Sequence, residues 1–323
     1  MLLLSLKDIQ ACIDMKQAIA LMKDAFTELS TGEGEVPVRH VLNNKSTETT
    51  ALFMPASMPE NKSLGLKVVG MNPQNLNKNL PFINAVILLL DTETGKTLAL
   101  MEASWITALR TGAGSGLATD YLARKDAETV AVFGAGVQAR TQLEAVCAVR
   151  NIAKAKVINR TPDKAIAFAE EMAEKLNINV EPGNVDDLKD ADIICTATTA
   201  YEPLFQHHQL KAGVHINAVG AYSPEMSEVP VETIAASKLV IDRKDACLHE
   251  AGDVVKAIKA GLLTESDLNC ELGEIAAGEK VGRTYDEEIT VFKSVGNAAQ
   301  DLVVASYIYQ KALMLNLGTS FEF

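Results

Sequence analysis

The chain has 323 residues, of which 48% are hydrophobic and 22% charged, as in a typical soluble globular protein. This length suits two domains, each large enough to bury a core. A formal net charge of −12 argues against nucleic acid and against an anionic membrane as partners, although an anionic ligand would respond to the local field instead.

Composition also bears on compartment and on metal binding. The apolar run at the start is too short for a signal peptide, and no segment reaches the roughly 18 apolar residues of a membrane span. The five cysteines are scattered and form no C-x-x-C pair, which is typical of reduced thiols. The histidines lack metal-ligand spacing, and His207 and His208 are expected to form a polar pair in a loop. We expect a cytoplasmic protein with no metal site.

The part of the chain before residue 103 predicts one helix followed by strands. Residues 8–30 place apolar side chains near helical spacing, with Asp14 as a candidate cap and the run Thr31-Gly32-Glu33-Gly34 as the end. Strands are expected at 51–54, 64–70, 84–90 and 98–101, with a hairpin loop at 91–96. A long helix at 103–123 follows. We interpret this part as an α+β domain of about 110 residues.

Three cations in this part are candidates for binding an anion. Arg39 lies near the start of a strand, Lys67 interrupts the apolar strand 64–69, and Arg110 lies in a largely apolar helix. A lysine in such a strand faces either solvent or a site, and an arginine in apolar surroundings needs an anionic partner. Because the three cations lack nearby carboxylates, they favour capture of a carboxylate substrate. The alternative for each is a structural ion pair.

The segment TVAVFGAGVQAR, residues 129–140, has the strand–turn–helix form of a dinucleotide fingerprint, G-x-G-x-x-A. Gly134 allows the tight turn, Gly136 lets a pyrophosphate approach the backbone, and Ala139 is small enough for the helix to pack on the strand. The helix N-terminus offers free N–H groups and a positive dipole end to the phosphates. The alternative is a glycine-rich turn with no ligand.

The end of the next strand predicts the type of dinucleotide. NAD-specific folds place an acidic residue there to bind the ribose 2′-hydroxyl, whereas this chain has Asn159 and Arg160. A guanidinium pairs with a 2′-phosphate, and Thr161 and Lys164 could add a hydroxyl and a second cation. The sequence therefore favours NADP(H) over NAD(H). The alternative is that Arg160 is a solvated surface charge.

The segments after the fingerprint alternate as in βαβ units. We expect strands at 155–160, 191–196, 215–219 and 239–242, and a helix at 162–176. This order predicts a Rossmann-type, doubly wound parallel sheet with right-handed crossovers. A final helix at 296–315 is expected to return to the first domain.

Several motifs occur in a fixed order along the chain. They are PVRH (37–40), FMPA (53–56), LGLKVV (64–69), ITALRTGA (106–113), FGAGVQA (133–139), NRT (159–161), HINAVGA (215–221), EAGDV (250–254) and VFKSVG (291–296). In these motifs the chain resembles the ornithine cyclodeaminase/μ-crystallin family over nearly its whole length. The resemblance implies a substrate-binding and dimerisation domain formed by residues 1–112 and 299–323. It also implies an NADP-binding Rossmann domain, residues 113–298, and a homodimer.

The resemblance also assigns roles to individual residues. It makes Arg39, Lys67 and Arg110 the substrate-carboxylate and catalytic cations. The positions that it implies for cofactor binding are Gly134, Ala135, Gly136, Val137, Gln138 and Ala139 in the phosphate turn, Asn159, Arg160, Thr161 and Lys164 at the next strand end, and Thr198, Val219 and Ser294 along the adenosine and nicotinamide parts.

Two departures from the family pattern indicate the substrate. Ornithine cyclodeaminases carry an aspartate after the INAV strand, where this chain has Tyr222, and a glutamate before the Met-Pro pair, where it has Leu52. Both differences remove carboxylates that suit a cationic diamine. The interpretation is an NADPH-dependent reductase, with NADH weaker, of a small cyclic imino acid such as 1-pyrroline-2-carboxylate or 1-piperideine-2-carboxylate. The alternatives are an alanine-type dehydrogenase, an ornithine cyclodeaminase and a μ-crystallin-like binding protein without activity.

Overall fold

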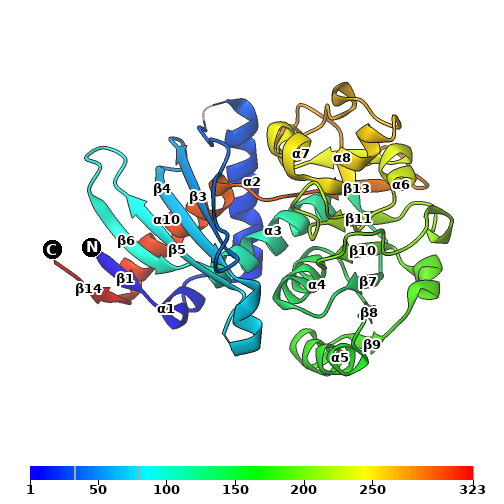
Figure 1. The fold of residues 1–323 in the computed structure, drawn as a ribbon, viewed down its shortest axis with the longest axis horizontal. Coiled ribbons are helices and arrows are strands. Elements are labelled where there is room, and N and C mark those ends of the chain that lie inside the picture. Colours follow the sequence, from blue (N-terminus) through cyan, green and yellow to red (C-terminus); the bar gives the residue numbers. More distant parts are fainter. Residues whose placement is uncertain (33, 79, 323) are drawn as a thin grey trace. The chain divides into compact units, whose positions relative to one another are not determined.

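The computed structural model describes residues 1–32, 34–78 and 80–322, and the chain divides into two compact units. Unit 1 comprises Met1–Arg110 and Asn297–Phe323, and unit 2 comprises Thr111–Gly296. Each unit contains one seven-stranded sheet (Figure 1). Unit 1 is therefore built from both ends of the chain.

Unit 1 is a largely antiparallel sheet in the strand order β14-β1-β6-β5-β4-β3-β2. The helix α3 begins in unit 1 and continues in unit 2. The elements are β1 (Leu2–Leu4), α1 (Leu6–Gln10), α2 (Met15–Thr31), β2 (His40–Asn44), β3 (Thr49–Met58), β4 (Ser63–Met71), the 3-10 helix η1 (Pro73–Lys78), β5 (Ile83–Leu90), β6 (Thr97–Glu102), α3 (Ser104–Leu122), α10 (Ala298–Leu315) and β14 (Thr319–Ser320).

The prediction of one helix at 8–30 was wrong, because two helices, α1 and α2, occupy this stretch. Asp14 has extended backbone angles, and its side chain accepts a hydrogen bond from the N–H of Gln17 at 2.8 Å. Asp14 therefore begins α2 as an N-cap, and a helix cannot continue through it. At the other end Gly32, with φ of 90°, terminates α2. Glu33 lies outside the described residues.

The helix α10 covers one face of the unit 1 sheet, where it packs against β3, β4 and β5 and also contacts α2 (Figure 1). Along β4 alternate residues are buried on this face, and Gly65 and Lys67 are among them. A Cβ on Gly65 would lie 2.2 Å from the carbonyl oxygen of Leu88 and 3.3 Å from the Leu302 side chain. Because α10 packs closely on this face, Lys67 lies in the interior of the unit and does not face solvent.

Unit 2 is a parallel sheet in the order β12-β13-β11-β10-β7-β8-β9, and each neighbouring pair of strands is parallel. Its elements are β7 (Thr129–Phe133), α4 (Val137–Val149), β8 (Lys154–Ile158), α5 (Pro162–Leu176), β9 (Asn179–Pro182), η2 (Val185–Asp190), β10 (Ile193–Thr196), η3 (His207–Gln209), β11 (His215–Ala218), α6 (Val231–Ala236), β12 (Lys238–Ile241), α7 (Lys244–Glu250), α8 (Gly252–Lys259), η4 (Glu265–Asp267), α9 (Leu272–Ala276) and β13 (Thr290–Lys293).

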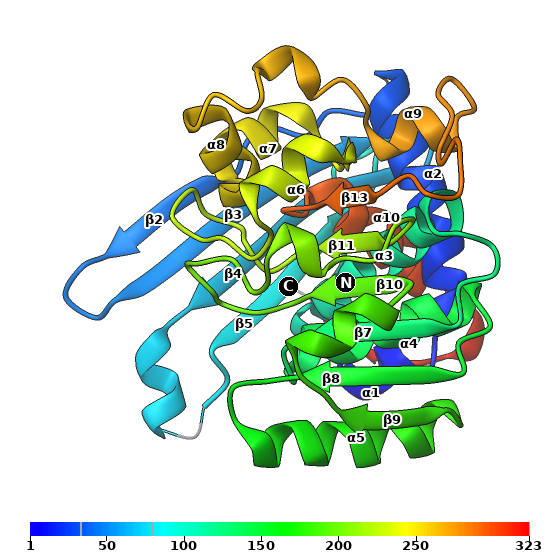
Figure 2. The same ribbon diagram turned by 90° about the vertical axis from the view of Figure 1, so that its right-hand side faces the viewer.

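The strand order of unit 2 changes direction at β7. The chain runs from β7 through β8 to β9 on one side, and β10 and the later strands lie on the other side (Figure 2). Such a switch point places a crevice at the carboxyl ends of the strands. The predicted Rossmann-type α/β class, with a second α+β domain, is confirmed.

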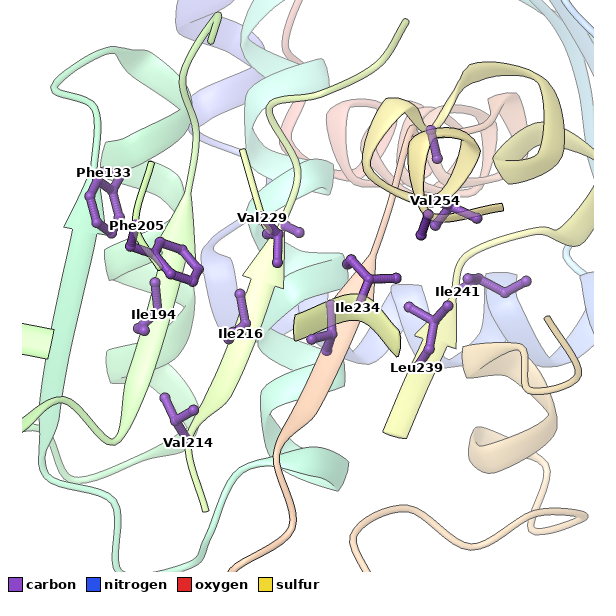
Figure 3. Close-up of a cluster of buried hydrophobic side chains, with 14 of the residues drawn as sticks. Phe133, Ile194, Phe205, Val214, Ile216, Val229, Ile234, Leu239, Ile241 and Val254 are labelled. Atoms are coloured by element: carbon purple, nitrogen blue, oxygen red, sulfur yellow. The ribbon is translucent and has the colours of Figure 1, made fainter. Parts of the chain in front are cut away.

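Apolar side chains on both faces hold the unit 2 sheet. Along β10, Ile194 points into one buried cluster, whereas Ile193 and Cys195 belong to the cluster on the opposite face. Figure 3 shows the first cluster, in which the rings of Phe133 and Phe205 lie 5.8 Å apart between centroids. A sheet buried on both faces needs continuous apolar strands, which explains the pattern of this half of the sequence.

The remaining expectations concern the histidines, cysteines and membrane spans. His207 and His208 lie in the short 3-10 helix η3, where His207 Nδ1 is 3.0 Å from Thr233 Oγ1. The five cysteines are free thiols. Residues 1–32, 34–78 and 80–322 hold no group of three His, Cys, Asp or Glu side chains arranged for a metal. In the same residues no helix is long and apolar enough to cross a bilayer.

Candidate cofactor and substrate sites

The turn between β7 and α4 has room for a ligand at one of its two glycines. Gly134 has φ of 101°, and a Cβ there would lie 2.6 Å from the carbonyl oxygen of Ala197, so the fold itself requires glycine. At Gly136 no heavy atom of the described chain, apart from those of the two adjoining residues, lies within 4 Å of an added Cβ. The space beside Gly136 is therefore open, as the approach of a pyrophosphate would require.

The start of α4 supplies donors to this space. Gly136 is the N-cap of the helix and has no side-chain oxygen to accept hydrogen bonds from the first N–H groups. A phosphate could therefore accept hydrogen bonds from these groups. The side-chain Oε1 of Gln138 is buried and has no hydrogen-bond donor within the described part of the chain. Ala139 is fully buried and lets α4 pack on the sheet, as predicted from its size. These features fit a dinucleotide.

The Arg140 side chain holds the backbone of the turn between β7 and α4. Its Nη1 donates to the carbonyl oxygens of Ala135 and Gly136, at 2.7 and 3.1 Å. Its Nη2 pairs with Glu171 of α5 at 2.6 Å, and the guanidinium lies 5.3 Å from the centre of the Phe168 ring. These contacts hold the carbonyl groups of the turn in place, on the side of Arg140.

The end of β8 presents free positive charge. Asn159 donates from Nδ2 to the carbonyl oxygen of Thr161 at 3.0 Å, which shapes the turn into α5. Arg160, Thr161 and Lys164 are exposed, and among the described residues neither cation has an ion-pair or hydrogen-bond partner. The two cations are therefore available to a phosphate group.

The other predicted cofactor residues follow neighbouring strands of the same sheet. Thr198 comes after β10, Val219 directly follows β11, and Ser294 directly follows β13. The carboxyl ends of parallel strands meet at one edge, so the fold brings these residues to the edge that also carries Gly134 and Asn159. Ser294 is 5% exposed, and its hydroxyl donates to Asp242 at 2.7 Å.

A buried carboxylate, Glu228, holds two of these loops, and sequence reasoning missed it. Its Oε1 accepts from the N–H and the hydroxyl of Thr198, at 2.6 and 2.7 Å, and its Oε2 accepts from the N–H of Gly220 at 2.7 Å and from the hydroxyl of Thr196 at 2.8 Å. Burial and the nearby Asp253 carboxylate raise the pKa of Glu228. The loops after β10 and β11 are thus fixed by one side chain.

A buried lysine extends this anchor. Lys293 at the end of β13 donates to the carbonyl oxygen of Ala221 at 2.7 Å and pairs with Asp253 at 2.9 Å. Both partners of the ion pair are fully buried. Lys293 lies in an apolar strand, as Lys67 does, and this pattern could have predicted a buried lysine from the sequence. No such pattern surrounds Glu228 or Asp253.

Unit 1 joins two of the three predicted substrate cations. Asp301 of α10 accepts from Lys67 Nζ at 2.6 Å through Oδ2 and from Arg110 Nε at 3.1 Å through Oδ1. Gln300 accepts from Arg110 Nη1 at 2.6 Å. The expectation that these cations lack a nearby carboxylate was therefore wrong. The carboxylate comes from the end of the chain, because α10 packs against β4.

The Asp301 carboxylate does not satisfy all the donors. The ammonium of Lys67 has three hydrogens, and it makes one hydrogen bond within the described residues. Arg110 Nη2 makes none in that part of the chain, although the Arg110 side chain is only 6% exposed. These hydrogens remain available to an anion, because both cations can donate more hydrogen bonds than Asp301 and Gln300 accept.

Arg39 is half-buried in the segment before β2, and its charge reaches Lys67. Burial is the largest cause that lowers the pKa of Lys67, to about 7, and the charges of Arg110 and Arg39 act in the same direction. The Asp301 carboxylate raises this pKa and so opposes them. The charged and neutral forms of Lys67 are thus close in free energy near neutral pH.

The model of the ornithine cyclodeaminase/mu-crystallin family matches residues 1–316. The chain belongs to this family. It is 43% identical to a Δ1-pyrroline-2-carboxylate reductase of Bacillus cereus, over the whole of both chains. The structure of the Thermococcus litoralis Δ1-pyrroline-2-carboxylate reductase in complex with NADH and L-proline superposes with a TM-score of 0.96, at 45% identity, covering 99% of this chain and 100% of that one.

A more distant member of the family assembles as a dimer. The structure of an archaeal alanine dehydrogenase dimer with bound NAD superposes with a TM-score of 0.94, at 34% identity, covering 100% of this chain and 99% of that one. The family thus includes reductases and dehydrogenases at similar structural distance from this chain.

The two positions at which the resemblance implied a departure from the cyclodeaminases lie in separate units. Tyr222 follows β11 and is 38% exposed, and burial of the rest of the ring raises the pKa of its phenol. Leu52 lies in β3, paired with Val69 of β4. Neither position offers a carboxylate to a substrate amine.

Proposed function

We propose that this protein is a reductase of small cyclic ketimines, with NADPH as the preferred reductant. The substrates would be 1-pyrroline-2-carboxylate and 1-piperideine-2-carboxylate, reduced to L-proline and L-pipecolate. The observation that carries the proposal is the pair of buried, incompletely bonded cations, Lys67 and Arg110, in a chain 43% identical to a named Δ1-pyrroline-2-carboxylate reductase.

Arg39 and Arg110 would hold the substrate carboxylate. Arg110 keeps Nη2 for it and is fixed through its other two nitrogens, so the orientation of the guanidinium is set before the substrate arrives. Arg39 adds charge from the segment before β2. Lys67 completes the anion site or supplies the proton to the imine nitrogen, and a protonated imine carbon is more electrophilic. A bound reduced nicotinamide supplies the hydride.

The proposed preference for NADPH depends on the end of β8. Arg160 and Lys164 offer two exposed charges to a 2′-phosphate, and Asn159 replaces the acidic residue that would repel it. Both structural relatives carry a cofactor without that phosphate, NADH in one and NAD in the other. The preference is therefore a property that we assign to residues 159–164 of this chain.

The absence of carboxylates at Tyr222 and Leu52 argues against a diamine substrate. A cyclodeaminase needs a group for the second amine of ornithine, and these positions cannot supply one. The two alternative functions that remain are an alanine-type dehydrogenase and a binding protein without activity.

A substrate panel tests the proposal. The purified protein is assayed with NADPH and with NADH on 1-pyrroline-2-carboxylate, 1-piperideine-2-carboxylate, pyruvate with ammonia, and L-ornithine. We expect the two cyclic imines to be reduced with the highest kcat/KM. Faster turnover of pyruvate with ammonia would favour the dehydrogenase, release of ammonia from ornithine would favour the cyclodeaminase, and no turnover with tight NADPH binding would favour a binding protein.

We also propose a homodimer. One face of the unit 1 sheet is covered by α10, whereas the opposite face carries a cross-strand row of half-exposed apolar side chains, Leu66, Leu88 and Leu100, beside the 43% exposed Val86. An uncovered apolar sheet face is typical of an association surface. A second copy of the chain is the occupant that we propose, because the related alanine dehydrogenase is a dimer.

A further inference from the structure

The buried carboxylate Asp301 connects the two cations on which the proposed function depends. One oxygen accepts from Lys67 at 2.6 Å, and the other accepts from Arg110 at 3.1 Å. The Asp301 side chain is fully buried, and its neighbour Gln300 binds the same guanidinium at 2.6 Å. Each oxygen thus holds a different cation, and the rigid carboxylate determines how far apart they lie.

We propose that Asp301 is a positioning residue of the reaction: it keeps Lys67 in the ammonium form and orients the Arg110 guanidinium, so that both direct their remaining hydrogens to the substrate. This inference rests on the proposed function and extends it to a residue that is not itself required to touch the substrate.

The charges around Lys67 explain why the carboxylate matters. α10 faces Lys67 with Asp301, α3 contributes Arg110, and the segment before β2 contributes Arg39. The strands on either side, β3 and β5, contain no titratable side chain. Without Asp301, Lys67 would therefore be buried among cations, and its neutral amine form would be favoured.

Both roles that the proposed function leaves open for Lys67 require the ammonium form. An anion site needs the positive charge, and a proton donor needs the proton. An opposite charge at this distance shifts a pKa by about 1–3 units. Removal of the Asp301 charge should therefore lower the pKa of Lys67 by at least about one unit.

The first measurement is made without substrate. Protein labelled with [ε-¹³C]lysine is titrated by NMR, and the Lys67 resonance is assigned by its loss in Lys67→Met. We expect Lys67 to titrate near neutral pH, Asp301→Asn to move the midpoint down by about one unit or more, and the charge-preserving Asp301→Glu to leave it within about half a unit of the original.

The second measurement is the pH dependence of kcat/KM for 1-pyrroline-2-carboxylate with saturating NADPH. Activity should fall as pH rises through the pKa of Lys67, because the ammonium is lost. In Asp301→Asn this limb should move to lower pH, in parallel with the NMR midpoint, whereas Asp301→Glu should restore its position. The ionisation of the substrate itself is common to all variants and therefore cancels in the comparison.

A purely structural role would lower kcat/KM equally at each pH and leave both midpoints unchanged, and that result would overturn the proposal. If the unmodified protein reduces no imine, the proposed function fails, but the NMR titration still decides whether Asp301 controls the pKa of Lys67.

If Asp301→Asn does not fold, the change is made in an Arg110→Met background, where one buried cation has been removed as well. There the same downward shift, relative to Arg110→Met alone, is expected, and no shift contradicts the proposal.

Discussion

Basic side chains with similar chemistry have opposite surroundings in this protein. Lys67 and Lys293 are buried, and each pairs with a carboxylate, at 2.6 and 2.9 Å. Arg160 and Lys164 are exposed at a strand end and have no partner in the described part of the chain. The buried pairs fix geometry, because breaking a buried ion pair is costly. The exposed charges remain available to a ligand that arrives from solvent.

The exposed Arg160 gives a prediction about cofactor choice. Arg160→Asp should weaken NADPH far more than NADH, because it removes one charge-assisted contact to the 2′-phosphate and adds repulsion. Such a contact contributes roughly 1.5–3 kcal/mol, which corresponds to about a ten- to over a hundredfold change in affinity. The dissociation constants of both cofactors are measured by fluorescence titration.

A matched control for this change is Lys16→Asp, which makes the same change of charge at an exposed position in the first turn of α2 in unit 1. It should alter neither dissociation constant. Equal loss of NADPH and NADH affinity in Arg160→Asp, or equal kcat/KM for the two cofactors in the unmodified protein, would contradict the proposed preference.

At the scale of secondary-structure elements, the two glycines of the turn between β7 and α4 serve different purposes. One is required by the fold and the other by a ligand. Gly134 adopts a backbone conformation that an L side chain rarely takes, and its neighbour Ala197 leaves no room for a Cβ. Gly136 has φ of −89° and open space around it in the described structure. The first glycine is thus a requirement of folding, and the second is a requirement of whatever occupies the space.

This difference predicts opposite effects of two alanine substitutions. Gly134→Ala should destabilise the free protein by about 1–3 kcal/mol, because of its left-handed φ and the contact with Ala197. Gly136→Ala should leave the melting temperature nearly unchanged, because a stiffer unfolded chain and a poorer N-cap are small opposing effects. It should weaken NADPH binding by about 1–3 kcal/mol, the usual cost of overpacking, or roughly five- to 150-fold.

Thermal unfolding without cofactor and fluorescence titration with NADPH measure the two effects separately. An unchanged NADPH dissociation constant in Gly136→Ala would show that the pyrophosphate does not approach this glycine. A stable Gly134→Ala protein would show that the turn can relax around the added methyl group.

At the scale of the whole molecule, the uncovered sheet face of unit 1 predicts self-association. Val68 and Val86 are direct cross-strand partners on that face, and Leu66 and Leu88 form the next such pair. A charge placed there would have to be desolvated in an interface between copies. Val86→Lys should therefore weaken or abolish the dimer.

Size-exclusion chromatography with light scattering measures the molecular mass of the variant. The control is Val281→Lys in unit 2, where the valine is 68% exposed and lies away from any strand or helix. The control should keep the mass of the unmodified protein. A Val86→Lys protein with unchanged mass would show that this face is not the interface, and a monomeric unmodified protein would contradict the homodimer itself.

The sequence determined the features that depend on neighbouring residues. The run from Val130 through Gly136 predicted a strand, a turn and a helix, because a buried strand, a positive φ and a helix start each leave a local signature. The alternation of strands and helices after it predicted a parallel sheet, and the parallel order in turn placed Asn159, Thr198 and Ser294 at one edge.

Only the tertiary structure decided which distant groups meet. Asp301 lies 234 positions after Lys67 and reaches it because α10 packs across β4, and no spacing rule relates two such positions. Glu228 likewise joins the loops that carry Thr198 and Gly220. The break between α1 and α2 was missed because apolar periodicity continued through a capping residue, Asp14. Local sequence determines which elements form, whereas packing of elements far apart in the chain determines which charges are paired and which remain free for a substrate.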